Sequence, residues 1–160
     1  MKKAMFAAGC FWGVQFYFDE VPGVVKTTVG YTGGHTQNPS YEDVSYKDTG
    51  HAEATLIEFD PKKVGYDTLV KQFFYMHDPT QMNRQGPDVG SQYRSAIFYI
   101  DDEQKKIAEA VRDESQKEQG KPIVTEITKA SEFYKAEDYH QKYTEKTGLG
   151  MCHIPYAPIS

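Results

Sequence analysis

Cys10 is the side chain whose type and place in the sequence point most directly to chemistry. It lies in Gly9-Cys10-Phe11-Trp12-Gly13, where a short apolar stretch ends and a predicted helix begins. A thiol at a helix N-terminus lies near the positive end of the helix dipole and near free backbone amides. Both lower its pKa and favour the reactive thiolate. The alternative is a buried cysteine of the core, the most common environment of a free thiol.

Two large aromatic side chains follow this thiol directly, Phe11 and Trp12. They could form an apolar wall beside the nucleophile, which would suit a methyl or methylene group of a substrate. They could equally pack into the core at the start of the helix.

Glu53 is a candidate acid at the beginning of a predicted strand. It shares one face of that strand with Thr55, Ile57 and Phe59. A carboxyl group held against apolar groups has a raised pKa and can stay protonated near neutral pH. In that form it could donate a proton. The sequence alone favours the simpler alternative, an exposed glutamate at a strand edge.

Three more polar side chains lie in two long predicted loops, Tyr41 in the first and Asp88 and Tyr93 in the second. Tyrosine hydroxyls are good donors to a polarised oxygen. Exposed tyrosines and aspartates are also common in loops, so each residue alone carries little weight.

Cys152 lies near the C-terminus, in a glycine-containing stretch. A flexible tail over residues 146–160 could bring this thiol to Cys10, although an incidental thiol fits as well. His153 raises the possibility of a zinc site, but such sites need closely spaced ligand pairs. The other histidines are scattered singly, at His35, His51, His77 and His140. We therefore expect no metal.

Composition limits the class of protein. The chain has 160 residues, of which 39% are hydrophobic and 26% charged, as in an ordinary globular domain. The net charge of −5 and the scattered basic residues argue against nucleic-acid binding. No signal peptide or membrane-spanning run is visible, so we expect a cytoplasmic protein. In that reducing compartment a lone cysteine pair is catalytic, metal-binding or incidental more often than a permanent disulfide.

The elements that would position these residues follow from hydrophobic periodicity and turn residues. Strands are predicted over residues 3–8, 24–31, 52–60, 95–100 and 123–128, and helices over 11–20, 66–77, 103–118 and 137–146. In the second strand, Val25, Val29 and Tyr31 are expected on one face. The long loops 33–50 and 78–93 lie between these elements, and loops of such length are usually functional.

The first six elements have the order βαββαβ, which matches the split βαβ pattern. We therefore predict an α+β fold with a ferredoxin-like split βαβ core, a mixed and mainly antiparallel sheet, long loops and a glycine-containing C-terminal tail. No linker or repeat divides the sequence. We expect a single catalytic domain over residues 1–160, with the tail over 146–160.

The segment around Cys10 resembles the signature of the peptide methionine sulfoxide reductase A family, which reduces the S epimer of methionine sulfoxide. Five further segments resemble the family in the same order and extend the similarity over nearly the whole chain. They are Gly30-Tyr31-Thr32-Gly33-Gly34, Pro39-Ser40-Tyr41-Glu42-Asp43-Val44, Gly50-His51-Ala52-Glu53, Asp88-Val89-Gly90-Ser91-Gln92-Tyr93-Arg94-Ser95 and Tyr139-His140-Gln141.

The resemblance implies a role for each matching residue. Cys10 matches the nucleophile, and Phe11 and Trp12 match the pocket for the methyl group of the sulfoxide. Glu53 matches the acid. Tyr41 and Tyr93 match the tyrosines that bind the sulfoxide oxygen, and Asp88 matches a polar residue at the pocket rim.

Cys152 stands where many members of the family have the resolving cysteine. Some members carry another cysteine further on, and this chain does not. The resemblance therefore implies a single Cys10–Cys152 disulfide that is reduced directly by thioredoxin.

These interpretations converge on a thiol-dependent peptide-methionine (S)-S-oxide reductase that repairs oxidised proteins and also uses the free amino acid. Attack by Cys10 would leave a sulfenic acid, which condenses with a thiol to a disulfide. We expect no cofactor, no nucleic-acid or membrane partner, and a monomer. The alternatives are a thiol peroxidase that uses the same two cysteines, a non-catalytic protein that binds methionine-containing peptides, and a zinc module.

Overall fold

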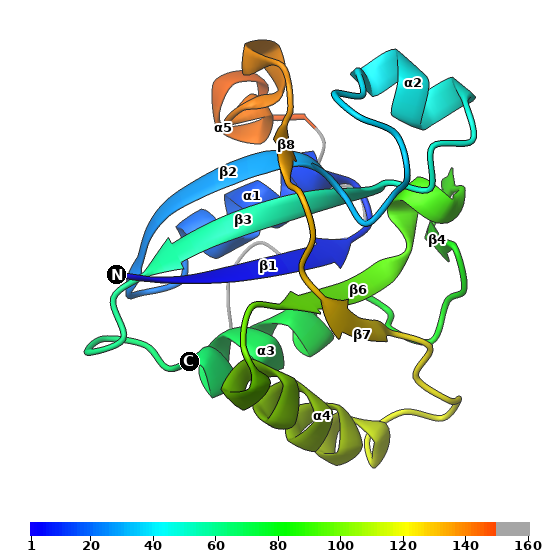
Figure 1. Ribbon diagram of the computed structural model, residues 1–160. Helices are drawn as coiled ribbons and strands as arrows, with labels where there is room; N and C mark the ends of the chain where they lie inside the picture. The colour runs from blue at the N-terminus through cyan, green and yellow to red at the C-terminus, as the bar shows by residue number, and fades with distance from the viewer. Residues whose placement is uncertain (150–160) are drawn as a thin grey trace.

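A six-stranded sheet organises residues 1–149, the part of the chain that the computed structural model describes (Figure 1). The strands lie in the order β7-β6-β1-β3-β2-β8. Their bounds are β1 Lys2–Ala8, β2 Val24–Thr32, β3 Ala52–Phe59, β6 Ser95–Tyr99, β7 Glu126–Lys129 and β8 Tyr134–Lys135.

The four inner strands have the arrangement of a split βαβ unit. β1 pairs antiparallel with β3 and β6, and β2 pairs antiparallel with β3. The helices α1 (Phe11–Asp19) and α3 (Tyr66–Met76) follow β1 and β3 in the chain. At the edges, β7 runs parallel to β6 and β8 runs antiparallel to β2. The predicted ferredoxin-like core with a mixed, mainly antiparallel sheet is therefore confirmed.

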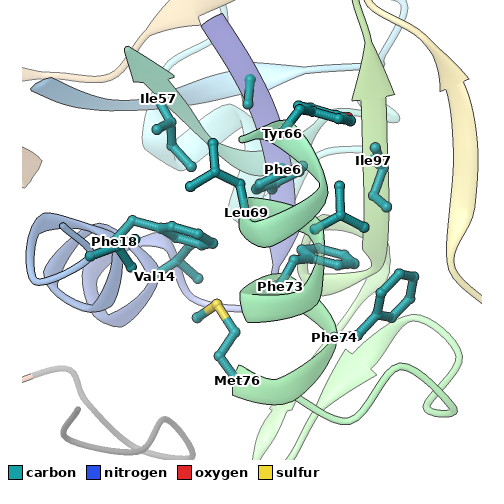
Figure 2. Close-up of a cluster of buried hydrophobic side chains, with 14 of the residues drawn as sticks. Phe6, Val14, Phe18, Ile57, Tyr66, Leu69, Phe73, Phe74, Met76 and Ile97 are labelled. Atoms are coloured by element: carbon teal, nitrogen blue, oxygen red, sulfur yellow. The ribbon is translucent and has the colours of Figure 1, made fainter. Parts of the chain in front are cut away.

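One hydrophobic core joins the sheet to α1 and α3 (Figure 2). It also includes Ala108 and Val111 of a third helix, α4 (Asp102–Gln116). Phe6 on β1 is its centre, and its ring lies 5.6 Å from that of Phe18 and 5.1 Å from that of Phe73. Leu69 of α3 is fully buried, as the helical spacing predicts. Because Phe6 packs against both α1 and α3, this core fixes α1 and α3 against β1.

The opposite face of the sheet is covered by the chain between β7 and β8, which crosses it (Figure 1). Phe133 packs there on a cluster that includes Met5, Ala54 and Phe98. The crossing is close because Gly30 has no side chain: a Cβ there would lie 2.5 Å from the Phe133 ring. Both faces of the inner strands are thus buried.

The two long loops contain short elements that the sequence prediction missed. The first holds α2 (Tyr41–Tyr46), and the second holds β4 (Arg84–Gln85), β5 (Asp88–Val89) and a 3₁₀ turn, η1 (Ser91–Tyr93). The helix α2 starts with a capping box, in which Ser40 Oγ accepts from the Asp43 amide and Asp43 Oδ2 accepts from the Ser40 amide, both at 3.1 Å.

Two further elements differ from the prediction. The strand expected over residues 123–128 forms only from Glu126, as β7. The helix expected over residues 137–146 is broken into a 3₁₀ turn, η2 (Asp138–His140), and α5 (Tyr143–Thr147). Lys142 interrupts it because its φ of 59° is left-handed and cannot continue a right-handed helix.

Val25 does not share the buried face of Val29 and Tyr31. It is 60% exposed, whereas Val29 and Tyr31 are fully buried. The register of β2 against β3 shifts between Val24 and Lys26. This bulge turns Val25 toward solvent, which strict alternation could not predict.

No helix within residues 1–149 is long and apolar enough to cross a membrane. The expected single domain over 1–160 stays a prediction. Most of its expected tail over 146–160, including Cys152, lies outside the described residues.

Candidate active site

Cys10 stands at the junction between β1 and α1, where the sequence placed it. Gly9 makes the turn with a φ of 94°, and Cys10 is the N-cap residue of α1. Its carbonyl oxygen accepts the first helical bond, from the Val14 amide at 3.4 Å. The side chain is partly buried. The thiol therefore lies at the start of a helix that is anchored in the main core.

The pKa of the Cys10 thiol is raised, which contradicts the expected low-pKa thiolate. Burial is the largest cause, and negative charge on Glu53 and Asp88 raises the pKa further. The backbone amides of Trp12 and Gly13 do lower it, as expected at a helix N-terminus, but the raising effects outweigh them. The thiol is therefore protonated at neutral pH in this structure.

Glu53 is buried beside this thiol rather than exposed at a strand edge. Only 2% of the residue is exposed, and its Oε1 accepts a hydrogen bond from the Phe11 amide at 3.2 Å. Burial raises the pKa of Glu53 to about 8 against the opposing effect of this bond, and the charge of Asp88 adds to the rise. At neutral pH the carboxyl group is mostly protonated and can act as a proton donor.

The three candidates from the long loops converge on the same place. Tyr41 opens α2, Tyr93 closes η1, and Asp88 lies on β5. Burial raises the pKa of both tyrosines, and charge on Glu53 raises it further, so their hydroxyls stay protonated and can donate. Asp88 Oδ2 is buried without a hydrogen-bond partner among the described residues. It is a free acceptor at the site.

Phe11 and Trp12 have different environments. Phe11 is buried, with its ring 5.7 Å from that of Tyr31. Trp12 is partly exposed and stacks on Tyr143, with 3.9 Å between ring centroids and 19° between planes. Its ring also lies 6.4 Å from that of Tyr41. An aromatic wall thus stands next to the thiol.

His140 and Tyr143 belong to this wall, although neither was predicted from the sequence to lie there. Trp12 Nε1 donates to His140 Nδ1 at 2.8 Å. Burial lowers the pKa of His140, so its ring is neutral and Nδ1 is free to accept. A signal was available: the only tryptophan of the chain carries an N–H group that needs an acceptor when half-buried. The sequence could not say which residue supplies it.

The remaining sequence candidates are not placed. Cys152 and His153 lie outside the described residues. Within residues 1–149, no group of three or more His, Cys, Asp or Glu side chains could hold a metal ion.

Comparison with known proteins points to one family. Residues 2–160 match the family model described as peptide methionine sulfoxide reductase. The chain is 58% identical over 151 residues to peptide methionine sulfoxide reductase MsrA of Methanosarcina acetivorans, covering 93% of this chain and 80% of that protein. It is 49% identical over 155 residues to the MsrA of Clostridium acetobutylicum, covering 97% and 96%.

Solved structures agree with the sequence matches. Reduced Mxr1 from Saccharomyces cerevisiae superposes with a TM-score of 0.87 at 36% identity, covering 93% of this chain and 87% of that chain. Methionine sulfoxide reductase A of Corynebacterium diphtheriae gives a TM-score of 0.84 at 38% identity, covering 96% and 82%. Mxr1 in complex with Trx2 gives a TM-score of 0.61 at 27% identity, covering 89% of this chain and 84% of that chain.

The raised pKa of Cys10 predicts the pH dependence of its alkylation. The reaction of Cys10 with iodoacetamide should rise through a midpoint above about 8.5, the value of an ordinary cysteine. Glu53→Gln should move that midpoint to lower pH, because it removes a neighbouring negative charge. The Cys10 peptide is followed by mass spectrometry, which separates it from Cys152. Glu58→Gln, on the opposite face of β3, is the matched control. A parent midpoint below 7 would contradict this account.

Proposed function

The chain belongs to the peptide methionine sulfoxide reductase family, and we propose that it reduces the S epimer of methionine sulfoxide through Cys10 and Glu53. As a member of this family it is an enzyme, a thiol-dependent methionine sulfoxide reductase that repairs oxidised proteins. The observation that carries our assignment of residues is the buried Glu53 carboxyl group. It is bonded to the Phe11 amide, next to Cys10, and has a pKa of about 8.

The reaction needs an acid because the sulfur–oxygen bond of a sulfoxide breaks only when the negative charge that develops on the oxygen is neutralised by a proton or a hydrogen-bond donor. The Cys10 sulfur attacks the substrate, and Glu53 gives its proton to the sulfoxide oxygen. The sulfur–oxygen bond of the substrate breaks, and methionine leaves. The oxygen ends on Cys10 as a sulfenic acid. The thiol proton of Cys10 passes to Glu53 and replaces the one that Glu53 gave, so thiol and sulfoxide together yield sulfenic acid and thioether.

The surroundings of Cys10 fit the two ends of a sulfoxide group. Trp12 and the Phe11 ring offer apolar contact to the methyl group. The hydroxyls of Tyr41 and Tyr93 can donate to the oxygen, where negative charge develops in the transition state. Asp88 Oδ2, buried and unpartnered within residues 1–149, can accept a hydrogen bond from the substrate at the rim. We propose both protein-bound and free methionine sulfoxide as substrates.

Recycling is assigned to Cys152 and thioredoxin. A sulfenic acid condenses with a thiol to a disulfide, and exchange with an external dithiol restores both thiols. The chain has two cysteines, so Cys152 is the partner available to Cys10. The structure of the related Mxr1 in complex with Trx2 supports thioredoxin as the reductant. Because this cycle needs a reducing environment, we also propose a cytoplasmic location and, from the sequence analysis, a monomer.

A thiol peroxidase would use the same two cysteines, but it would need neither an aromatic wall for a methyl group nor a neutral Glu53. The family comparisons do not favour it. With hydrogen peroxide in place of the sulfoxide, we expect turnover far below that with the S epimer.

The assignment of Cys10 predicts the outcome of an epimer assay. With dithiothreitol as reductant, the parent should reduce the S epimer of a methionine sulfoxide peptide and leave the R epimer unchanged. Cys10→Ser should abolish the reaction, because a hydroxyl cannot replace the thiol as nucleophile and reductant. Methionine formation is measured by chromatography. Retained turnover in Cys10→Ser would remove the basis of the whole proposal.

The pKa of Glu53 predicts how the reductive step depends on pH. Below about pH 8 the Glu53 carboxyl group is neutral and can donate a proton. The single-turnover rate should therefore fall as the pH rises through 8. Glu53→Gln should slow this step by about 10²- to 10⁴-fold and remove the fall. Circular dichroism checks the fold, and Glu58→Gln is the control. If Glu53→Gln has only a mild effect, the acid is another group.

The assignment of Cys152 predicts that Cys152→Ser separates reduction from recycling. The variant should form about one methionine per enzyme, because Cys10 still reacts, and then stop with thioredoxin as reductant. Methionine formed per enzyme is measured with thioredoxin, thioredoxin reductase and NADPH. Continued turnover would show that recycling does not need this residue.

A further inference from the structure

The helix that carries Tyr41 contacts the rest of the protein through a small set of side chains, among them the Tyr41 ring, which lies 4.5 Å from the ring of His140. α2 has six residues and lies between two loops, away from the sheet (Figure 1). Val44 is its buried side chain and packs near Phe11, Tyr31 and Ala136. The capping box and the ion pair between Asp43 and Lys47 are internal to α2 and its flanks. These local bonds shape the helix but do not fix its place relative to Cys10.

One hydrogen bond ties α2 to a distant segment. The Tyr41 amide donates to Glu137 Oε2 at 3.1 Å, across 96 positions of sequence. Among residues 1–149 it is the only hydrogen bond between α2 and an element distant in the sequence. The first amides of a helix have no partner within the helix, so Glu137 satisfies a donor that the capping box leaves open.

The other carboxylate oxygen of Glu137 holds the side chain in place. Its Oε1 accepts from the Tyr31 hydroxyl at 3.0 Å, and Tyr31 is fully buried on β2 opposite Glu53. Burial alone would raise the pKa of Glu137, but hydrogen bonds from its own amide, the Tyr41 amide and Tyr31 outweigh this and lower it. Glu137 is therefore an anion at neutral pH, and both of its oxygens accept.

The segment that carries Glu137 is itself rigidly attached. Gln141 accepts from the Val29 amide at 3.0 Å and donates to the Val29 and Ala136 carbonyls. The Lys142 amide donates to Gln15 of α1 at 2.7 Å. Glu137 thus stands on a fixed support against both β2 and α1, and α2 is positioned against it.

We propose that Glu137 is a positioning residue for Tyr41: its two carboxylate bonds fix the start of α2 so that the Tyr41 hydroxyl is aimed at the sulfoxide oxygen. This inference rests on the proposed function, in which Tyr41 donates to that oxygen. Glu137 itself touches no reacting atom. Because the hydroxyl would meet charge that develops in the transition state, misplacing it should lower the maximal rate more than it weakens substrate binding.

The test is a double-mutant cycle on the reductive step in the full chain. Single-turnover rates with the S epimer are measured for the parent, Glu137→Ala, Tyr41→Phe and the double variant. Loss of an aimed hydrogen bond should lower the maximal rate of Glu137→Ala by about 3- to 10-fold, with half-saturation nearly unchanged. In the Tyr41→Phe background the same change should have no further effect. Equal factors in both backgrounds would overturn the proposal, as would an unchanged rate in Glu137→Ala.

Controls separate this role from a general loss of structure. Asp138→Asn changes the exposed neighbouring acid, whose ion pair within residues 1–149 is with Lys135, and should leave the rate unchanged. Glu137→Gln keeps one acceptor oxygen and should lie between the parent and Glu137→Ala, which keeps the test available if the alanine variant does not fold. Trp12 is the only tryptophan, so unchanged fluorescence shows that the aromatic wall is intact. An inactive parent would reject the proposed function together with this inference, whereas an active parent with an unaltered Glu137→Ala rejects the inference alone.

Discussion

The burial of one carboxyl group beside a thiol is the constraint on which the site depends. Within residues 1–149, the Glu53 carboxyl group accepts one hydrogen bond, from the Phe11 amide, and it is otherwise buried in its strand. A buried carboxylate with so few donors is costly, so the group holds its proton to a pKa of about 8. The pairing of β1 with β3, in which Phe6 faces Thr55, brings the end of β1 and hence Cys10 beside it. The fold therefore keeps this carboxyl group protonated near neutral pH by burying it at this position.

The same burial that keeps Glu53 protonated also raises the pKa of Cys10. Three groups that could be negative, Cys10, Glu53 and Asp88, are close enough for the charge of the carboxyls to raise the pKa of the thiol. Keeping the thiol and the Glu53 carboxyl neutral avoids like charges in a small buried volume. In the proposed reaction, an oxygen atom moves from the substrate sulfur to the Cys10 sulfur, and Cys10 and Glu53 supply the protons. A low-pKa thiolate would add a negative charge next to the acid and would raise its pKa further.

The sequence predicted those features that local patterns determine. The strand-to-helix position of Cys10, the apolar face of α3 and the split βαβ order all follow from periodicity and turns. Three features could not be predicted because their causes lie far away in the sequence or in tertiary burial. The helix α2 in a polar loop is held by Glu137, and Val25 is turned outward by a bulge. The Cys10 pKa is raised mainly by burial, and carboxyls from other strands raise it further. The capping box at Ser40 was the one local signal for α2.

The segment from Glu137 to Tyr143 explains how a site built at the start of the chain depends on its end. His140 accepts from Trp12 at the first turn of α1, and Lys142 reaches Asp19 at the last turn, at 2.6 Å. Both ends of α1 are therefore held by one segment more than 100 residues later, and Glu137 of the same segment holds α2. In the proposed function, Trp12 contacts the methyl group of the substrate and Tyr41 donates to its oxygen. Both residues are held by this segment, Trp12 through His140 and Tyr41 through Glu137. Their relative positions are consequently fixed by one structural unit, even though they come from different elements.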